Sequence, residues 1–143
     1  MAKLQFWSKK IKDDLAIYSI IPQKTQMLKP PYFLKEEYWI DYIRGYFDGD
    51  GSIYTVGENS IGFEIVGASK DLIEWIRLVF ANKYGITNNG LYKEQNENKL
   101  IIYKTVYYGK KLRQIYDILY TPSSLFMKRK KDKFNLLLNS KRL

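Results

Sequence analysis

The chain has 143 residues and a formal net charge of +9, from 24 Lys and Arg against 15 Asp and Glu. This length fits one ordinary domain, and the excess of cations favours polyanionic partners such as nucleic acid. The chain contains no cysteine and no histidine, which excludes disulfides, zinc fingers, thiol chemistry and imidazole-based catalysis. No apolar run is long enough to span a membrane and the basic start has no signal-peptide stretch, so we expect an intracellular protein.

The first third of the chain predicts two helices joined by a linker. Residues 1–21 have the pattern of a helix that ends at Pro22, and the polar segment 23–31 reads as a linker or an extended arm. Residues 36–47 form a second predicted helix, with apolar side chains on more than one face, that stops at Gly49-Asp50-Gly51. We therefore divide the chain into an N-terminal helix and arm, residues 1–35, and a main domain, residues 36–143.

The rest of the chain predicts two hairpins and three further helices. Apolar residues alternate over 52–68 around a turn at 57–59, and again over 91–95 and 99–107. Ser69 is a good N-cap for a helix over 70–84, one helix follows Gly109 and the last covers roughly 125–138. From residue 36 on, the order of the predicted elements is α-β-β-α-β-β-α-α. It predicts an α+β fold, with one four-stranded antiparallel sheet that carries helices on one face.

The other face of this sheet is expected to be open. A curved β surface of this size can enter the major groove of DNA, although an ordinary solvated face has the same pattern. The side chains that we expect on the open face are Tyr54, Ser60 and Glu64 from the first hairpin, with Lys93 and Gln95 from the second.

Two carboxylates, Asp48 and Asp50, lie at the end of the second predicted helix. Gly45 and Gly49 share one face of that helix, so two such helices can approach closely. Their acidic ends would then converge and repel unless a cation lay between them. Mg²⁺ prefers oxygen ligands of this kind, and the arrangement resembles a metal-bridged hydrolytic centre.

Residues Ile43 to Gly51 are similar, position by position, to the signature of the LAGLIDADG homing endonucleases, with Arg44 in place of the usual small residue. The resemblance covers roughly residues 36–141 and includes the order of the elements. It implies that Asp50 is the catalytic metal ligand, that the Gly51 carbonyl is a further ligand and that Asp48 caps or orients the helix end. It also implies that Lys130 is an active-site lysine, and Ser69 stands where some members have a catalytic glutamine.

The resemblance further implies a site-specific endonuclease that makes double-strand breaks with short 3′ overhangs in a long, near-palindromic DNA target. The cofactor would be Mg²⁺ or another divalent cation such as Mn²⁺ or Ca²⁺. The gene would be intron-encoded, and the protein would act in the cytoplasm or nucleoid or where an organelle genome lies. Because the motif occurs once, we expect a homodimer. The expected interface residues are Gly45, Tyr46, Asp48 and Gly49, and the expected DNA contacts are Tyr54, Ser60, Glu64, Lys70, Lys93, Gln95, Lys104, Lys128, Arg129 and Lys131.

Other functions stay open at this point. A binder of the same fold that does not cut, either an intron RNA maturase or a transcription regulator, would keep the basic surface and need no metal. A plain interaction domain predicts no salt-sensitive affinity for DNA, and the two aspartates would then only end a helix. An EF-hand is disfavoured, because its sixth position would be Ile53 where glycine is needed and its twelfth would be Asn59 where glutamate is needed.

Overall fold

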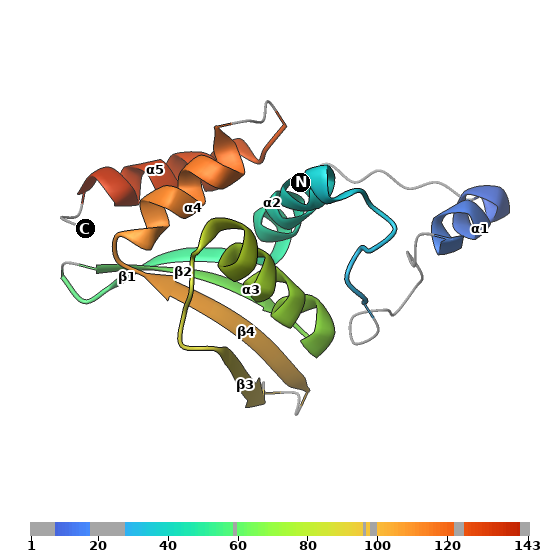
Figure 1. Ribbon diagram of the computed structural model, residues 1–143, viewed down its shortest axis with the longest axis horizontal. Helices are drawn as coiled ribbons and strands as arrows, with labels where there is room; N and C mark the ends of the chain where they lie inside the picture. The colour runs from blue at the N-terminus through green and yellow to red at the C-terminus, as the bar shows by residue number, and fades with distance from the viewer. Residues whose placement is uncertain are drawn as a thin grey trace.

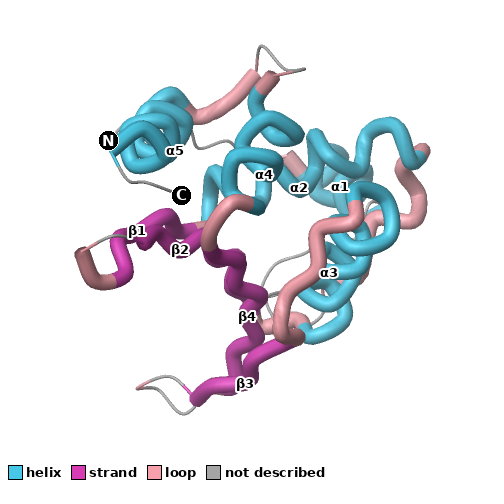
Figure 2. Tube along the Cα trace, turned by 60° about the vertical axis from the view of Figure 1, so that its left-hand side comes forward, coloured by secondary structure: helices cyan, strands magenta, loops and turns pink. Residues whose placement is uncertain are grey.

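The computed structural model describes residues 8–17, 28–58, 60–95, 97, 100–121 and 125–140. One antiparallel sheet, with strand order β1-β2-β4-β3, forms a layer beneath helices α2 to α5, which all lie on the same face (Figures 1 and 2). This confirms the predicted α+β fold and both hairpins. In chain order the elements are α1 (Lys9–Ile17), the 3-10 turn η1 (Glu36–Tyr38), α2 (Trp39–Asp50), β1 (Ser52–Val56), β2 (Ser60–Gly67), α3 (Lys70–Tyr84), β3 (Leu91–Gln95), β4 (Ile101–Tyr108), α4 (Lys111–Tyr120) and α5 (Lys128–Ser140).

The hydrophobic core lies between the sheet and the helices. Phe63 on β2 is at its centre: its ring stacks on Phe47 of α2 at 4.4 Å and lies 5.6 Å from the ring of Phe134 on α5. All three rings are fully buried. Burial of a side chain of this size contributes about 1.5–3 kcal/mol, so these contacts fix the end of α2 against both the sheet and α5.

The strand register decides which side chains face the helices. Residues paired across antiparallel strands share a face, and Ile53, Phe63 and Tyr107 are paired in series and buried in the core. By the same alternation, Gly67, Tyr103 and Lys93 are paired in series on the helix side.

The prediction that Lys93 and Gln95 lie on the open face was therefore wrong. Lys93 pairs with Tyr103 and lines a cavity with Lys70 and Arg77 of α3, while Gln95 pairs with Ile101 and has the same parity as Lys93. The only aliphatic residue of β3 is Leu91, which packs against the core on the same face as Lys93. A single apolar position gives too short an alternation to show which face β3 turns to the helices.

The N-terminal region is described only in part. The predicted helix 1–21 is present as α1 over Lys9–Ile17, where every residue is exposed, and Figure 1 shows α1 apart from the sheet and its helices. Pro22 and most of the linker segment lie outside the described residues.

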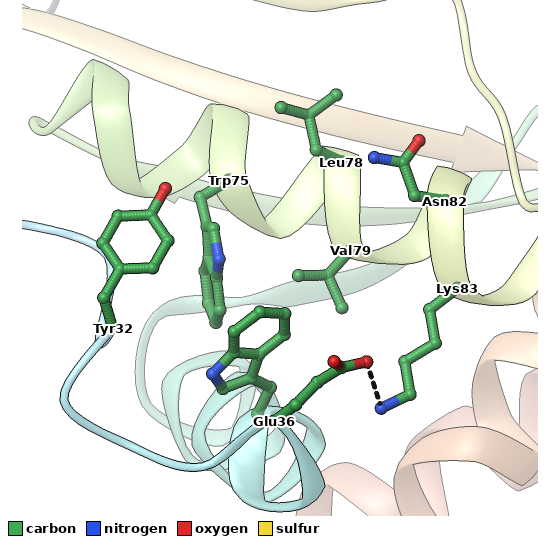
Figure 3. Close-up of a pocket in the computed structure, with 8 residues that line it drawn as sticks. Tyr32, Glu36, Trp75, Leu78, Val79, Asn82 and Lys83 are labelled. Atoms are coloured by element: carbon green, nitrogen blue, oxygen red, sulfur yellow. Dashed lines mark ion pairs between the residues drawn. The ribbon is translucent and has the colours of Figure 1, made fainter.

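The segment that leads into α2 is fastened to α3. Lys29 pairs with Asp71 at 2.6 Å, and Glu36 pairs with Lys83 at 3.0 Å. Between these ion pairs lies a largely apolar cavity of about 360 Å³, in which Trp75 faces Tyr32 (Figure 3). None of the site residues predicted from the sequence lines this cavity.

Candidate functional site

The two aspartates at the end of α2 have opposite environments. Asp48 is only 7% exposed, and both its oxygens accept hydrogen bonds: Oδ1 from the Tyr120 hydroxyl at 2.8 Å and Oδ2 from the Met127 backbone N–H at 2.7 Å. It thus joins α2 to the end of α4 and to the residue before α5. This is the structural role that we expected, but Asp48 was wrongly placed at the predicted interface, because it points into the fold.

Asp50 is exposed and makes no hydrogen bond or ion pair with any residue that the structure describes. Its charge still acts on its neighbours: burial raises the pKa of Tyr46 to about 12, with the Asp50 carboxylate as the second cause. Of the two carboxylates in the motif, Asp50 alone is therefore accessible to a cation or to a partner.

The glycines of the motif lie on a face of α2 that none of the described residues covers, called the uncovered face below. Gly45 and Gly49 are both exposed, and a Cβ atom built at either position would meet no atom within 4 Å. Tyr46 lies beside this face, but its hydroxyl turns to the sheet and donates to the Val66 carbonyl at 3.2 Å. The uncovered face thus presents bare backbone next to Asp50.

Arg44, which departs from the family signature, points away from the glycine face. It is 5% exposed, and its Nε donates to the Leu125 carbonyl at 2.8 Å while Nη1 donates to the Leu119 carbonyl at 3.3 Å. Nη2 pairs with Asp41 at 2.7 Å. The guanidinium therefore holds one carbonyl in the last turn of α4 and one in the segment before α5, and its bulk does not obstruct an approach to Gly45 and Gly49.

Gly51, the first residue after α2, is held tightly. A Cβ atom at this position would lie 2.0 Å from the Phe47 ring, so no side chain fits without moving that ring. The carbonyl of Gly51 accepts a hydrogen bond from the ammonium of Lys130 on α5, and so does the Phe47 carbonyl, at 3.3 Å. The oxygen expected to bind a metal therefore already has a cationic partner.

Lys130 is itself buried, with 8% of its surface exposed, and its Nζ lies 5.0 Å from the centre of the Phe47 ring. Burial lowers its pKa, and the charge of Arg129 lowers it further. A cation at this point compensates the negative end of the α2 dipole. The ammonium of Lys130 thus lies against the end of α2, where it is engaged with backbone carbonyls rather than solvated.

Ser69 is the N-cap of α3, as its sequence context predicted. Its hydroxyl accepts from the Leu72 backbone N–H at 3.2 Å and donates to the Leu28 carbonyl, and the residue is 4% exposed. Because both hydrogen bonds serve the fold, this geometry lends no support to the catalytic role that was expected of it.

The open face of the sheet carries four of the predicted DNA contacts: Tyr54, Ser60, Glu64 and Lys104 share its register. Lys104 pairs with Glu94 and lies 3.8 Å from Glu64, so its charge is neutralised within the face. This face therefore offers hydroxyl and carboxylate groups suited to base edges, with little free positive charge for phosphates.

The remaining predicted contacts lie on α3, on α5 and, for Lys93 and Gln95, on the face of β3 that is turned to the helices. Lys70 and Lys93 line a polar cavity of about 700 Å³ at the edge of the sheet. Lys128, Arg129 and Lys131 lie at the start of α5. Lys133 was not predicted, although it lies one turn after Arg129 and lines a cavity with that residue and Gly51. Its helical spacing from Arg129 was the signal available in the sequence.

Comparisons with known proteins identify one family. A family model described as a LAGLIDADG-like domain matches residues 37–119, which include α2, the whole sheet, α3 and most of α4. No curated protein and no solved structure gave a match. Among the described residues, no helix combines the length and the apolar character that crossing a membrane requires.

Proposed function

Because the chain belongs to the LAGLIDADG family, whose members are homing endonucleases or maturases, we propose that it is a site-specific homing endonuclease that cuts both strands of a long, near-palindromic DNA target. The observation that carries this proposal is the exposure of the Asp50 side chain and its lack of a partner among the described residues. This carboxylate lies at the end of a helix whose glycine face is uncovered. A carboxylate without a partner adds nothing to the stability of the fold. Metal-dependent hydrolysis of a phosphodiester would give it a role, as a ligand of the metal ion.

One chain supplies only part of the expected metal site. Asp50 fits a hard divalent cation such as Mg²⁺, but the Gly51 carbonyl is engaged by Lys130. The described residues contain no group of three acidic, histidine or cysteine side chains able to hold a metal. We infer that the other ligands come from the Asp50 of a second subunit, from DNA phosphates and from water.

The uncovered face of α2 supports this arrangement. Two copies of α2 packed through Gly45 and Gly49 would bring both Asp50 side chains to one end of the helix pair, in a symmetric dimer. A divalent cation held there would supply Lewis acidity to the scissile phosphate. The protein's own contribution is to place the two carboxylates, to keep Asp48 out of the site and to present two sheet faces to the two half-sites.

The test is cleavage of a library of randomised duplexes with Mg²⁺ or Mn²⁺, followed by sequencing of the cut ends. We expect the wild-type protein to yield one recurrent site with short 3′ overhangs. Asp50→Asn should still bind the recovered duplex and cut it at least about a hundredfold more slowly. Asp117→Asn, which removes an exposed carboxylate from α4, should cut as the wild type does.

Full cleavage by Asp50→Asn would refute the proposal, and so would a wild-type protein that cuts no duplex with either metal. The same Asp50→Asn variant also distinguishes an endonuclease from a maturase, because a maturase would not need this carboxylate. If the chain assists splicing of an intron RNA and the variant does so equally well, the protein is an RNA binder that does not need this carboxylate.

A further inference from the structure

The cations at the start of α5 are adjacent in the sequence, yet the fold engages them differently. Lys128 pairs with Asp132 at 2.5 Å on the helix surface. The ammonium of Lys131 lies 3.9 Å from the centre of the Phe126 ring and 6.0 Å from that of Tyr120. A cation over an aromatic face is held by the ring's negative potential, so both lysines already have partners on their own side of α5.

The side chain of Lys130, unlike those of Lys128 and Lys131, points from α5 towards α2. Its ammonium enters the fold and donates to two carbonyls at this end of α2: that of Gly51, and that of Phe47, which also accepts the Gly51 backbone N–H. To bind a phosphate, the Lys130 side chain would have to rotate outward, away from α2. The Gly51 carbonyl would then lose its hydrogen bond from the ammonium, and the positive charge would leave the helix end that it compensates. An unpaired buried carbonyl costs about 1–3 kcal/mol, so the buried position is favoured.

Arg129 and Lys133 are the two cations that remain. They lie four residues apart on one face of α5, both are exposed, and neither has a hydrogen bond or an ion pair to the described residues. Together with Lys130 they line a cavity of about 400 Å³ whose other wall is Gly51, Ser52 and Ile53. No carboxylate lines this cavity, although its wall begins at the residue after Asp50.

We propose that Arg129 and Lys133 form a binding site for a phosphate of the nucleic-acid backbone beside Asp50, and that Lys130 is a positioning residue which holds the end of α2 without touching that phosphate. The proposal rests on the proposed function for the identity of the ligand. It reassigns the lysine that the family resemblance places in the active site and adds Lys133, which the resemblance did not indicate.

The chemistry of the cavity fits a phosphodiester. A guanidinium offers two parallel N–H donors to a phosphate, and an ammonium one turn away adds a mobile point charge. The backbone at Gly51 and Ser52 forms the opposite wall and lies directly after the proposed catalytic carboxylate. A phosphate bound here would thus be positioned next to Asp50 by groups that the fold does not otherwise use.

The first test measures the salt dependence of binding to a short labelled duplex of random sequence, by fluorescence anisotropy without divalent metal. Each phosphate contact contributes about 0.9 to the slope of log K against log salt. We expect Arg129→Gln/Lys133→Gln to flatten that slope by about 0.9 or more per chain. Lys35→Gln/Lys110→Gln removes the same charge from exposed positions elsewhere and should flatten it by less than half as much.

The second test uses Lys130→Met, which keeps the length of the side chain and removes its charge. We expect hydrogen exchange over residues 47–53 to become at least about tenfold faster, because the last turn of α2 loses its anchor. The slope for duplex binding should equal that of the wild type. The double variant Arg129→Gln/Lys133→Gln should show the opposite pattern: a flatter slope for duplex binding, and hydrogen exchange over residues 47–53 equal to that of the wild type.

A double variant that behaves like its charge-matched control would overturn the phosphate site. Because Arg129 and Lys133 are both exposed, we expect the double variant to fold as the wild type does. A Lys130→Met protein with a flattened slope and unchanged exchange would make Lys130 the phosphate contact instead. If the wild-type chain shows no salt-dependent binding to duplex DNA at all, the proposed function itself fails. The two failures are therefore distinguishable.

Discussion

Asp48 and Asp50 stand two residues apart on α2, and the difference between them is one of orientation. Asp48 points to α4 and receives two donors, whereas Asp50 points to solvent and receives none from the described residues. A helix advances by about 100° per residue, so side chains two positions apart lie on nearly opposite sides. The two carboxylates of one short motif can therefore serve stability and chemistry separately.

The hydrogen bond from Tyr120 to Asp48 should carry measurable stability. Tyr120→Phe removes a buried hydroxyl that donates to a carboxylate, and bonds to charged groups contribute about 1.5–3 kcal/mol. We expect the free energy of unfolding in urea to fall by about that amount. Tyr116→Phe, one turn earlier on the same helix, is the control and should change it by less than about 0.5 kcal/mol. Equal effects of the two substitutions would contradict a special role for this contact.

Tyr107 predicts a dependence of stability on alkaline pH. Its side chain is 1% exposed, its hydroxyl finds no hydrogen-bond partner among the described residues, and burial raises its pKa to about 12. Between its unfolded value near 10 and the raised folded value, the unfolded chain loses this proton first. The folded state therefore loses stability as the pH rises through that interval.

Tyr107→Phe removes this ionisation, and with it an unpaired polar group. We expect the variant to be as stable as the wild type or more stable at neutral pH. At about pH 11 it should be more resistant to urea than the wild type by roughly a further 1 kcal/mol. Paired urea titrations at the two pH values provide the measurement, and parallel losses in both proteins would show that Tyr107 does not titrate as stated.

At the scale of elements, α5 and α3 hold the helix that carries the motif. α5 reaches α2 through the ammonium of Lys130, and its Phe134 ring lies 6.2 Å from the Phe47 ring. On the other side, Trp39 and Tyr42 of α2 meet the Trp75 ring of α3 edge-on, at 5.4 and 6.0 Å. The helix is thus fixed on two sides, and its glycine face is left uncovered.

The N-cap of α3 gives a prediction at this scale. Ser69→Ala removes the acceptor for the Leu72 N–H and the donor to the Leu28 carbonyl, so the free energy of unfolding should fall by about 0.5–2 kcal/mol. Ser69→Thr keeps both hydrogen-bonding functions and should lose less. If Ser69 serves only the fold, the rate of cleavage by Ser69→Ala, measured well below its unfolding temperature, should equal that of the wild type. A large loss of rate in a folded Ser69→Ala protein would restore the catalytic role.

At the scale of the whole molecule, the proposed dimer can be tested at the glycine face. Gly45→Leu fits the single chain, because no atom of the described residues lies within 4 Å of a Cβ there, and the substitution should raise helix stability by about 0.5–1 kcal/mol. Two helices packed through this face would be forced apart. We expect wild-type protein to sediment as a dimer and Gly45→Leu as a folded monomer without cleavage activity.

The control for this substitution is Asn82→Leu, which adds the same side chain to an exposed position of α3 and should leave the dimer intact. Circular dichroism of both variants would show that the fold is retained. A Gly45→Leu protein that still sediments as a dimer would place the interface elsewhere, and the shared metal site would then have no structural basis.

The sequence by itself determined the local elements and the family of this protein. The helical and alternating periods gave the hairpins and the helix over residues 70–84, and the capping residues Ser69 and Gly85 gave the ends of that helix. These features depend on neighbours in the chain, so they can be read without the fold. The motif of residues 43–51 likewise predicted the family that the comparison then identified.

The tertiary structure alone decided which side chains remain free. Lys130 and Arg129 are neighbours in one run of cations, yet one is buried on the end of α2 and the other lines an open cavity. Lys93 on β3 faces the helices, and Arg44 caps α4. The positions of Lys130 and Arg44 depend on partners 40 or more residues away, and that of Lys93 on the pairing of a strand whose only aliphatic residue is Leu91. Such long-range pairings leave no periodic trace in the sequence, and so only the fold could show them.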